Sequence, residues 1–421
     1  MRKPNVAIIV LDTLREDHAQ GLDRLLDYGF VKYQNAIAPA PWTLPSHVSM
    51  FTGLYPSEHG IYETQERRGE ELIRYSRLGM NALKDHNIFD KLKDEGYTTY
   101  LISANVAWVT PLTGIKADVN ILIDFLTKMI ITDDIMKIDE DEKVIKYGGR
   151  LNFLPNTIRN KNLTDIVMAS KLFLLRRLRK LPGYISEYFV RDKGGELIHS
   201  LIGTMHFDEP FFLFVNLMES HDPYTSLRKV KKMRCATLRW ILTGEIRPED
   251  KKFWRNYALH AERAVNTALK VVTTILKQYD ASTTLVIVTA DHGELLGDDG
   301  LHHVYSLKDG NIKVPLYVKY PEDWKKKKQR TYISLTEIPK ILDPEVEYLG
   351  SNIALAETFG PFQTDETFKQ CNLKTPLDIT FQHKIRILHD KFDILFNKTL
   401  NKIESMQGDK EIATKLLKIY T

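Results

Sequence analysis

Short apolar runs alternate with longer amphipathic segments over roughly the first 330 residues of the chain. β-Branched and aromatic runs predict buried strands at residues 6–10, 97–102, 211–218 and 284–289. Apolar residues at helical spacing predict helices over residues 83–92, before Gly96, and over residues 263–278. Because strands alternate with helices, we expect an α/β fold with a mostly parallel central sheet flanked by helices on both faces.

A different pattern begins near residue 331, where short strand candidates follow one another and residues 409–419 favour a closing helix. These strand candidates are residues 353–356, 385–388, 392–396 and 400–403. We therefore predict two domains, a large α/β domain over residues 1–330 and a small α+β C-terminal domain over residues 331–421.

Residues 115–205 follow neither pattern, and we interpret them as a variable insertion in the large domain. They include a basic amphipathic segment at residues 169–181. A helix there would either pack its apolar face on the core, which is the better explanation, or contact an anionic lipid surface.

Composition places the chain among soluble globular proteins, because 43% of its 421 residues are hydrophobic and 27% are charged. Its net charge of +4 does not indicate nucleic-acid binding. No segment has the roughly 20 apolar residues of a membrane span, and the run at residues 6–11 is too short for a signal sequence. Cys235 and Cys371 have no metal or redox spacing. We expect two buried thiols without a disulfide, in a cytoplasmic protein.

Polar residues follow the predicted strands at the edge where open α/β sheets place their sites. Asp12 follows the first strand, His221 follows the third in NLMESHDPY, and Asp291 and His292 follow the fourth in VTADHGELLGDDGLHH. Two carboxylates with a histidine form a mixed oxygen and nitrogen ligand set for a divalent cation. Taken singly, Asp12 is better explained as a helix cap and His221 as a structural residue. Their combination predicts metal-assisted displacement on a tetrahedral ester.

The hydroxyl group of Thr43 is a further candidate site group, beside the carboxylates and histidines. Pro45 suits the first turn of a helix, which puts Thr43 near a helix N-terminus, where backbone N–H groups favour an anion. A hydroxyl in such a place can lose its proton beside a metal and attack phosphorus or sulfur. By itself Thr43 is better explained as a helix cap. His303, after Gly300, is placed to return towards the same edge.

Four motifs in this order resemble the sulfatase-like members of the alkaline phosphatase superfamily. They are LDTLRED, TLPSH with FTGLYPSEHG, PFFLFVNLMESHDPY, and TADHGE with a later VPL. The tail segment HKIRILHDKFDILFN resembles that family's C-terminal sheet. The resemblance implies that residues 1–330 are the catalytic domain of a metal-dependent ester hydrolase. It further implies a metal held by Asp12, Thr43, Asp291 and His292, with Thr43 as nucleophile and His221 and His303 on the leaving group and substrate oxyanion.

Departures from the family pattern bear on the substrate. Thr43 stands where true sulfatases carry the Cys or Ser that becomes formylglycine, and His47 stands where they carry Arg. Asn105 lies in the stretch that aligns with the family's sulfate-contacting Lys and His. We therefore predict phosphoester cleavage, of a phosphodiester or of a phosphate or phosphonate monoester. Asn105, His47 and His302 are the candidate substrate-binding residues.

One divalent ion, Mn, Zn, Mg or Ca, is predicted per site, since we find no clear match to the Asp-x-x-x-His pattern of a second metal site. Two alternatives stay open, a sulfate ester hydrolase and a metal-binding pseudoenzyme. The expected partner is a small or anionic ester, with no nucleic acid, and the sequence leaves the oligomeric state open. A basic run after His221 is either a solvated surface or a contact for a polyanionic substrate. It comprises Arg228, Lys229, Lys231, Lys232 and Arg234.

Overall fold

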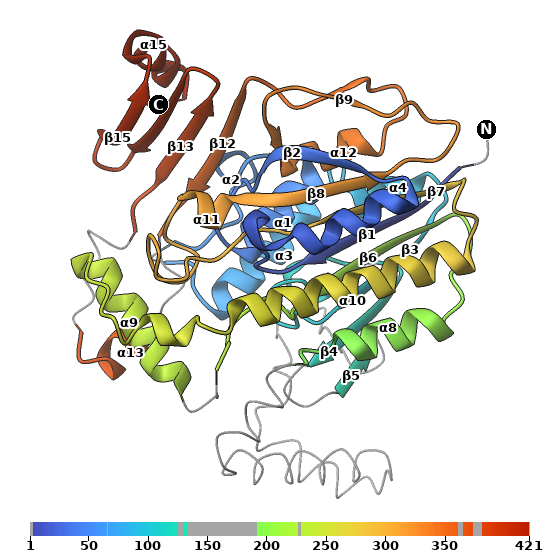
Figure 1. Ribbon diagram of the computed structural model, residues 1–421, viewed down its shortest axis with the longest axis horizontal. Coiled ribbons are helices and arrows are strands. Elements are labelled where there is room, and N and C mark those ends of the chain that lie inside the picture. The colour runs from blue at the N-terminus through green and yellow to red at the C-terminus, as the bar shows by residue number, and fades with distance from the viewer. Residues whose placement is uncertain are drawn as a thin grey trace, which may run out of the picture.

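The fold comes from a computed structural model that describes residues 3–64, 66–124, 129–132, 192–225, 229–360, 365–373 and 381–420. Within these residues, nine strands form a central sheet (Figure 1). In spatial order they are β10 (Ile333–Ser334), β2 (Val31–Ile37), β8 (Lys313–Lys319), β7 (Thr284–Thr289), β1 (Asn5–Leu11), β6 (Phe211–Leu217), β3 (Thr98–Ser103), β4 (Val119–Asp124) and β5 (Met129–Thr132). The five strands from β7 to β4 run parallel to one another, while β8 and β5 are antiparallel to their neighbours.

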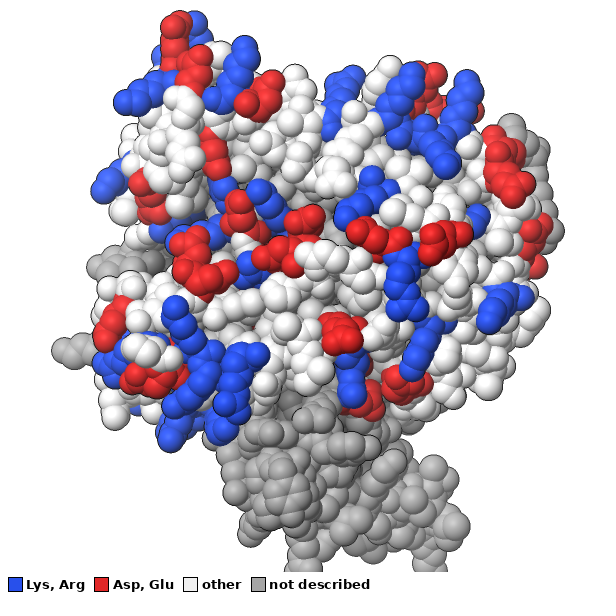
Figure 2. All heavy atoms as spheres, viewed as in Figure 1, with Lys and Arg blue, Asp and Glu red and all other residues white. Residues whose placement is uncertain are grey.

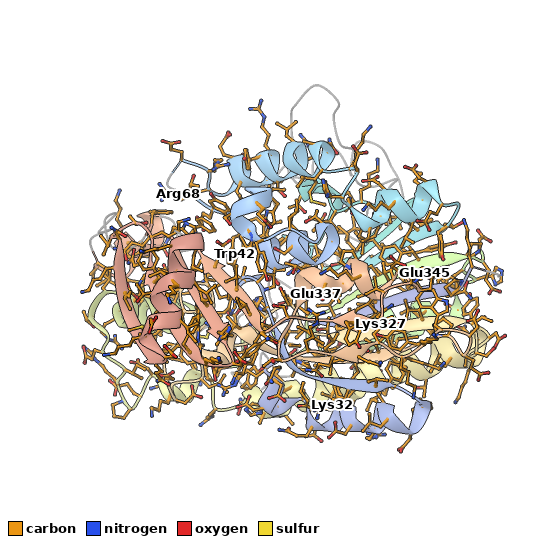
Figure 3. The ribbon with its side chains drawn as sticks, turned by 90° about the horizontal axis from the view of Figure 1, so that it is seen from above. Lys32, Trp42, Arg68, Lys327, Glu337 and Glu345 are labelled. Atoms are coloured by element: carbon orange, nitrogen blue, oxygen red, sulfur yellow. A yellow bond between two sulfur atoms is a disulfide. The ribbon has the colours of Figure 1, made fainter. Side chains whose placement is uncertain are left out.

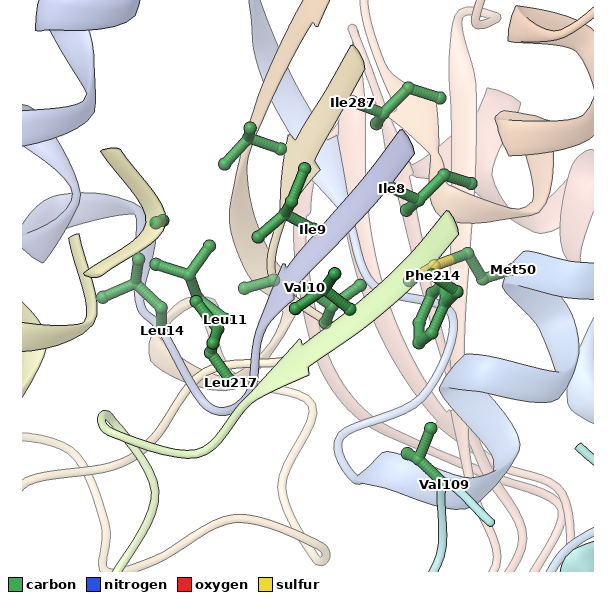
Figure 4. Packing of buried hydrophobic residues seen from close by; sticks show 14 of the residues in the cluster. Ile8, Ile9, Val10, Leu11, Leu14, Met50, Val109, Phe214, Leu217 and Ile287 are labelled. Carbon is green, nitrogen blue, oxygen red and sulfur yellow. The ribbon is translucent and has the colours of Figure 1, made fainter. Parts of the chain in front are cut away.

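Strand β1 lies at the centre of the parallel run, paired with β6 on one side and β7 on the other. Every residue of β1 is buried, which explains why its sequence is continuously apolar from Val6 rather than alternating. Figure 4 shows Ile8 beside Phe214 of β6 and Met50 on one face, and Ile9 near the opposite face. Because β1 is buried on both faces, its position in the sheet is well defined. The residues that follow the ends of the strands are therefore held in defined positions as well.

Helices cover both faces of the sheet, as the viewpoint of Figure 3 shows. On one side α10 packs on β1, β7 and α8, and on the other α1 packs on α4 and α12. The helices are α1 (Thr43–Thr52), α2 (Pro56–His59), α3 (Glu70–Ala82), α4 (Ile88–Asp94), α8 (Gly195–Thr204), α9 (Val230–Thr243), α10 (Tyr257–Gln278), α11 (Asp309–Ile312), α12 (Ile338–Ile341), α13 (Asp365–Gln370) and α15 (Lys410–Tyr420). Short 3-10 helices are η1 (Glu16–His18), η2 (Gln20–Tyr28), η3 (Pro111–Thr113), η5 (Lys251–Phe253) and η6 (Leu335–Glu337).

The α/β class is confirmed, and the four predicted strands of the large domain lie within one residue of β1, β3, β6 and β7. The helix predicted at 83–92 is confirmed only in its second half, because α3 ends at Ala82 and α4 begins at Ile88, which leaves residues 83–87 outside both helices. Asn87 ends the intervening turn and caps α4 by accepting a hydrogen bond from the backbone N–H of Phe89. The helix predicted at 263–278 begins six residues earlier, at Tyr257.

The C-terminal segment forms a second, antiparallel sheet of β12 (Ile353–Thr358), β13 (Lys384–His389), β14 (Phe392–Asn397) and β15 (Lys402–Gly408). Helix α15 packs on β14 and closes this unit as predicted. The strand predicted at 400–403 is misplaced, since residues 398–401 form the turn and Asn401 has a positive φ of 48°. Strand β10, beyond the predicted boundary at 330, still belongs to the central sheet, through β2.

The expected free thiols are wrong, because Cys235 of α9 and Cys371 after α13 form a disulfide. Figure 1 shows α9 and α13 side by side. The pairing escapes sequence reasoning because 136 positions separate the two residues. The basic segment at 169–181 and Arg228 lie outside the described residues. None of the helices in the described part of the chain combines the length and the apolar character that a membrane crossing needs.

Buried charges also occur far from the predicted site. Lys327, labelled with Glu337 in Figure 3, is buried, and its ammonium donates to the backbone carbonyls of Asp343 and Val346. Glu337 accepts a hydrogen bond from the backbone N–H of Gly350 at 2.7 Å. The side chains of Lys327 and Glu337 therefore bind backbone groups of the segment between β8 and β12 and hold this segment in place.

Candidate active site

The carboxyl ends of four adjacent parallel strands bring the predicted residues together. Asp12 follows β1, Asp291 and His292 follow β7, His221 follows β6, and Asn105 follows β3. The strands pair in the order β7, β1, β6 and β3. Residues more than 270 positions apart therefore meet at one edge, where the sheet's topology predicts a site.

Asp12, Asp291 and His292 form a buried cluster, in which one potential ligand atom from each residue lies within 4.8 Å of the other two. The His292 Nδ1 lies 2.9 Å from the carbonyl of Gly293. Donation to that carbonyl leaves the Nε2 lone pair facing the carboxylates, 3.4 Å from Asp291 Oδ2. Asp12 Oδ2 accepts a hydrogen bond from the Asn105 amide at 2.9 Å.

A divalent cation fits this cluster for two reasons. Asp291 Oδ2 is buried and has no hydrogen-bond partner among the described residues, although buried carboxylate oxygens are normally satisfied. Burial raises the pKa of Asp291, and the charge of Asp12 raises it further. Burial also acts to raise the pKa of Asp12, but His221, His292 and His47 outweigh it and lower the value. A bound cation would satisfy the orphan oxygen and the adjacent carboxylates together.

Thr43 is the first residue of α1, as the position of Pro45 predicts. Its Oγ1 lies 3.3 Å from Nε2 of His292, so the hydroxyl faces the cluster of Asp12, Asp291 and His292. The preceding Trp42, labelled in Figure 3, packs edge-on against Trp108 with ring centroids 5.5 Å apart. Ser46 donates to the carbonyl of Asp291 at 2.6 Å and ties the first turn of α1 to the end of β7. The hydroxyl is thereby held at a helix N-terminus.

His47 and Asn105 are occupied by the protein itself. The Nδ1 of His47 lies 2.9 Å from the carbonyl of Thr43, and its Nε2 lies 3.4 Å from the Asn216 amide. The amide of Asn105 donates to Asp12, and its oxygen accepts the backbone N–H of Trp108 at 3.0 Å. His47 therefore contacts the first turn of α1 and Asn105 contacts the cluster, and the contact of either side chain with substrate stays a prediction.

His221 is the most basic of the histidines at this edge. Its Nδ1 lies 2.8 Å from Oδ1 of Asp222. Burial acts to lower the pKa of His221, but Asp222 and Asp12 outweigh it and raise the value to about 10. The ring packs edge-on against His303 with centroids 5.2 Å apart. His221 is therefore protonated at neutral pH and placed beside the cluster, as a proton donor must be.

His303 and His302 reach the same edge from the loop after β7. The ring of His303 lies 4.7 Å from that of His292, and His302 stacks on it at 4.0 Å. Burial lowers the pKa of His303 well below its usual value, and the neighbouring histidines add to the effect. His303 is thus a neutral imidazole, whose Nδ1 lies 3.3 Å from Oε2 of Glu294.

Sequence reasoning missed a buried polar layer behind these residues. Lys193, immediately before α8, is fully buried, and its ammonium donates to the backbone carbonyls of Glu219 and His221. Burial lowers the pKa of Lys193 to about 8. Glu294 is also fully buried and accepts a hydrogen bond from the Tyr224 hydroxyl at 2.7 Å. Glu294 directly follows Asp291, His292 and Gly293, so its place in this motif could have identified it as a residue near the site. Lys193 lies in no such motif, and its neighbours in the sequence give no signal.

Basic residues gather on the surface beside this edge. Figure 2 shows a group of Lys and Arg side chains over α9, where Lys231, Lys232 and Arg234 are exposed. Helix α9 packs against the loop after β7. The ring of Trp240, on α9, lies so close to Gly300 of this loop that a Cβ at Gly300 would collide with it. The charge of Arg234 acts to lower the pKa of His302, so α9 lies within electrostatic reach of the site.

Comparison with protein families gives a match over most of the chain. The profile of the family described as Sulfatase matches residues 4–343. Among curated proteins, none matches the sequence.

Solved structures share the fold over almost the whole chain. A 2-O GAG sulfatase has a TM-score of 0.61 and 12% identity, over 99% of this chain and 90% of that one. The phosphonate monoester hydrolase of Silicibacter pomeroyi has a TM-score of 0.55 and 15% identity, over 99% and 94%. A structure described as bound to its substrate D-glucosamine-2-N,6-O-disulfate has a TM-score of 0.50 and 12% identity, over 97% and 92%.

Proposed function

The chain belongs to the sulfatase family of ester hydrolases, in the alkaline phosphatase superfamily, and from that premise we propose that it cleaves a phosphoester with Thr43 as nucleophile. The substrate class is a phosphodiester or a phosphate or phosphonate monoester. One observation carries the proposal: an unmodified hydroxyl, Thr43 Oγ1, lies 3.3 Å from Nε2 of His292, which belongs to the cluster with Asp12 and Asp291.

Asp12, Asp291, His292 and Thr43 would hold one divalent cation, Mn, Zn, Mg or Ca. The donor set of two carboxylates, an imidazole and a hydroxyl suits all four, with the imidazole favouring Mn and Zn over Ca. When bound, the cation would supply a Lewis acid that lowers the pKa of the Thr43 hydroxyl and offsets negative charge on the ester.

The first half of the reaction transfers the phosphoryl group to Thr43. The Thr43 oxygen, having released its proton to solvent, forms a bond to phosphorus in line with the bond to the leaving oxygen, which breaks. His221 donates its proton to that oxygen, so the leaving group departs as an alcohol. Backbone N–H groups at the start of α1 stabilise the equatorial oxygens as charge develops.

The second half of the reaction hydrolyses the phosphorylated Thr43 and regenerates the free enzyme. Water attacks phosphorus opposite Thr43, and the now neutral His221 accepts the proton from that water. Thr43 departs and regains a proton, and phosphate, or a phosphate or phosphonate carrying the retained substituent, is released. A formylglycine hydrate expels sulfate through its second hydroxyl, which Thr43 lacks, and this difference favours phosphorus over sulfur as the reacting atom.

A panel of p-nitrophenyl esters tests the nucleophile. Phosphate monoester, bis-phosphodiester, phosphonate ester and sulfate are assayed with Mn, Zn, Mg and Ca in turn. Thr43→Ala is expected to reduce turnover of the best phosphorus ester by about 10³-fold or more, since the nucleophile is removed. Thr43→Ser, which keeps the hydroxyl, is expected to retain measurable turnover.

Thr52→Ala is the matched control, because Thr52 is also buried on α1 but donates to the carbonyl of Val48. Full activity in Thr43→Ala would overturn the proposal. Sulfate release alone would favour the second candidate, a sulfate ester hydrolase, which the fold shared with a 2-O GAG sulfatase supports. Metal binding without turnover of any ester would favour a pseudoenzyme.

A further inference from the structure

Tyr305 lies beside the candidate active site, two residues after His303 in the loop that follows β7. The backbone N–H of the preceding residue, Val304, donates to the carbonyl of Pro41 at 2.9 Å. Pro41 is itself two residues before Thr43, so the segment that carries Tyr305 runs beside the segment that leads to the proposed nucleophile. A side chain in this position can contact the organic part of an ester whose phosphorus lies at Thr43.

Glu63 reaches the same place from the segment after α2, through a series of contacts. The adjacent Tyr62 stacks on Phe359 with ring centroids 3.5 Å apart. Thr358, which precedes Phe359 at the end of β12, donates to the carbonyl of Val304 at 2.8 Å. The segment of Glu63 is thereby packed on the end of β12, which is in turn bonded to the loop after β7.

The Tyr305 hydroxyl and the Glu63 Oε2 are buried without a hydrogen-bond partner among the described residues. Glu63 is only 4% exposed. Burial raises the pKa of Tyr305 well above its usual value and Glu63 adds to the effect, so the two groups lie within electrostatic reach of each other. Buried polar groups are normally satisfied. Two orphan groups at one place therefore indicate that a ligand completes their hydrogen bonds.

Both groups are uncharged at neutral pH, which restricts what they can bind. Burial raises the pKa of Glu63 to about 9, although the charge of Arg68 acts to lower it. The protonated carboxyl group and the phenol each offer an O–H donor and an acceptor oxygen. An alcohol hydroxyl also donates and accepts, so it can bond both groups at once. A charged group would lose its hydration here, and neither of these two partners offers a counter-charge.

We propose that Glu63 and Tyr305 form a subsite that binds a hydroxyl group on the alcohol portion of the substrate. The substrate is then the ester of a polyhydroxy alcohol rather than of a plain alkyl or aryl alcohol. The subsite rests on the proposed function, because it requires an ester bound at Thr43. Glu63 and Tyr305 determine specificity, and the bond changes themselves involve Thr43 and His221.

Binding of two matched probes tests the subsite without turnover. The probes are myo-inositol 1-phosphate and cyclohexyl phosphate, which share a six-membered ring with and without hydroxyl groups. Their dissociation constants are measured by calorimetry on the full chain carrying Thr43→Ala, at saturating Mn²⁺. The inositol ester should bind at least about tenfold more tightly, because it gains hydrogen bonds to two buried groups. Phosphate release from either probe by this variant would contradict the proposed function, whereas the ratio of the two constants judges the subsite.

Further substitutions, each added to Thr43→Ala, locate the preference. Tyr305→Phe and Glu63→Met remove hydrogen-bonding atoms, and each should lower the ratio at least about threefold. Glu63→Gln should keep the ratio, because an amide also donates and accepts. Tyr317→Phe is the matched control, since Tyr317 is also buried but its hydroxyl donates to Asp23, and it should leave the ratio unchanged.

Thermal unfolding separates a binding role from a structural one. Because the Tyr305 hydroxyl has no partner within the described part of the chain, Tyr305→Phe should not lower the melting temperature. Tyr317→Phe should lower it, because the hydrogen bond to Asp23 is lost. Equal affinity of Thr43→Ala for the two probes, or a preference that survives both Tyr305→Phe and Glu63→Met, would overturn the subsite.

Discussion

Two histidines at the edge of the sheet have opposite charge states because different groups face them. His221 contacts the carboxylate of Asp222. His303 lies among other imidazoles, and the carboxyl group that it faces, Glu294, has a pKa raised well above its usual value by burial and is therefore uncharged. Burial disfavours the charged form of each histidine, yet the pKa of His221 is raised to about 10 while that of His303 is far below its usual value. One imidazolium and one neutral imidazole therefore coexist at neutral pH, which suits His221 to the proposed role of proton donor.

The substitution Asp222→Asn tests whether the protonated His221 is the proton donor. Without the carboxylate charge, burial dominates and the pKa of His221 falls, so the proton-bearing form is lost at lower pH. The alkaline limb of kcat, expected near pH 10 in wild type, should move down by at least about one pH unit. The pH profile is measured on the best phosphorus ester, with Asp23→Asn, far along the chain beside Lys32, as control. An unmoved limb would show that His221 is not the acid.

At the scale of elements, the loop after β6 depends on a lysine from another element. Lys193 precedes α8, and its ammonium binds the carbonyls on either side of Ser220 and approaches Nδ1 of His260 at 3.3 Å. The amide N–H of Gly195, on α8, donates to Oε1 of Glu219 at 2.7 Å. The start of α8 thus contacts the backbone that carries His221, and we expect Lys193 to position this histidine.

Lys193→Met should therefore lower kcat with little change in KM or in metal stoichiometry. It leaves two buried carbonyls without their donor, at about 1–3 kcal/mol of stability for each. Lys319→Met is the matched control, because Lys319 is also buried and donates to the carbonyl of Ala281 at the far end of β7. Both variants should lose thermal stability, but at a permissive temperature Lys319→Met should keep wild-type kcat. Equal kcat in the two would make Lys193 merely structural.

An element can be predicted from the sequence when its own residues determine it, and it is missed when contacts with distant residues determine it. Strands β1, β6 and β7 are continuous apolar runs buried on both faces, and their own composition locates them. The strand predicted around Leu400 is misplaced, because Leu400 is 56% exposed in a turn and its apolar character reports no burial. Ends of parallel strands place Asp12, Asp291 and His292 together once the fold class is known.

Contacts between distant elements escape that reasoning. Lys193 has no local signal, since its importance lies in the carbonyls of a loop that follows another strand. The hydrogen bonding of Glu294 depends on where Tyr224 and His303 lie. Cys235 and Cys371 lie on segments that meet only in the folded chain. Such pairings follow from packing, which the residue pattern does not specify.

At the scale of the whole molecule, α9 links the site to the surface and to the C-terminal unit. Its Trp240 packs on the loop that carries His302 and His303, and its disulfide holds the segment after α13, between β12 and β13. A cytoplasmic location stays a prediction, and this bond stands against it, because disulfides persist mainly in oxidising compartments. Helix α9 thus presents its exposed basic side chains from a fixed position beside the site.

We expect this basic surface to select anionic substrates over neutral ones. Replacing Lys231, Lys232 and Arg234 by Gln removes three positive charges from the exposed side of α9. The inhibition constant of dextran sulfate against p-nitrophenyl ester hydrolysis should rise by about tenfold at low salt, because attraction of a polyanion depends on such a field. The difference should shrink towards 1 M salt, where the screening length is only about 3 Å. Turnover of the uninhibited small ester should stay at the wild-type level.

The control for net charge alone is a second triple variant, at Lys325, Lys326 and Lys328. These lysines are exposed, and they precede or belong to the short strand β9 (Lys328–Gln329). Their triple change to Gln alters net charge by the same amount but lies on another part of the chain. If both triple variants weaken inhibition equally, the effect is a property of net charge and α9 has no special role. A loss confined to the α9 variant would place the recognition of anionic groups beside His302, where the charge of Arg234 already reaches the site.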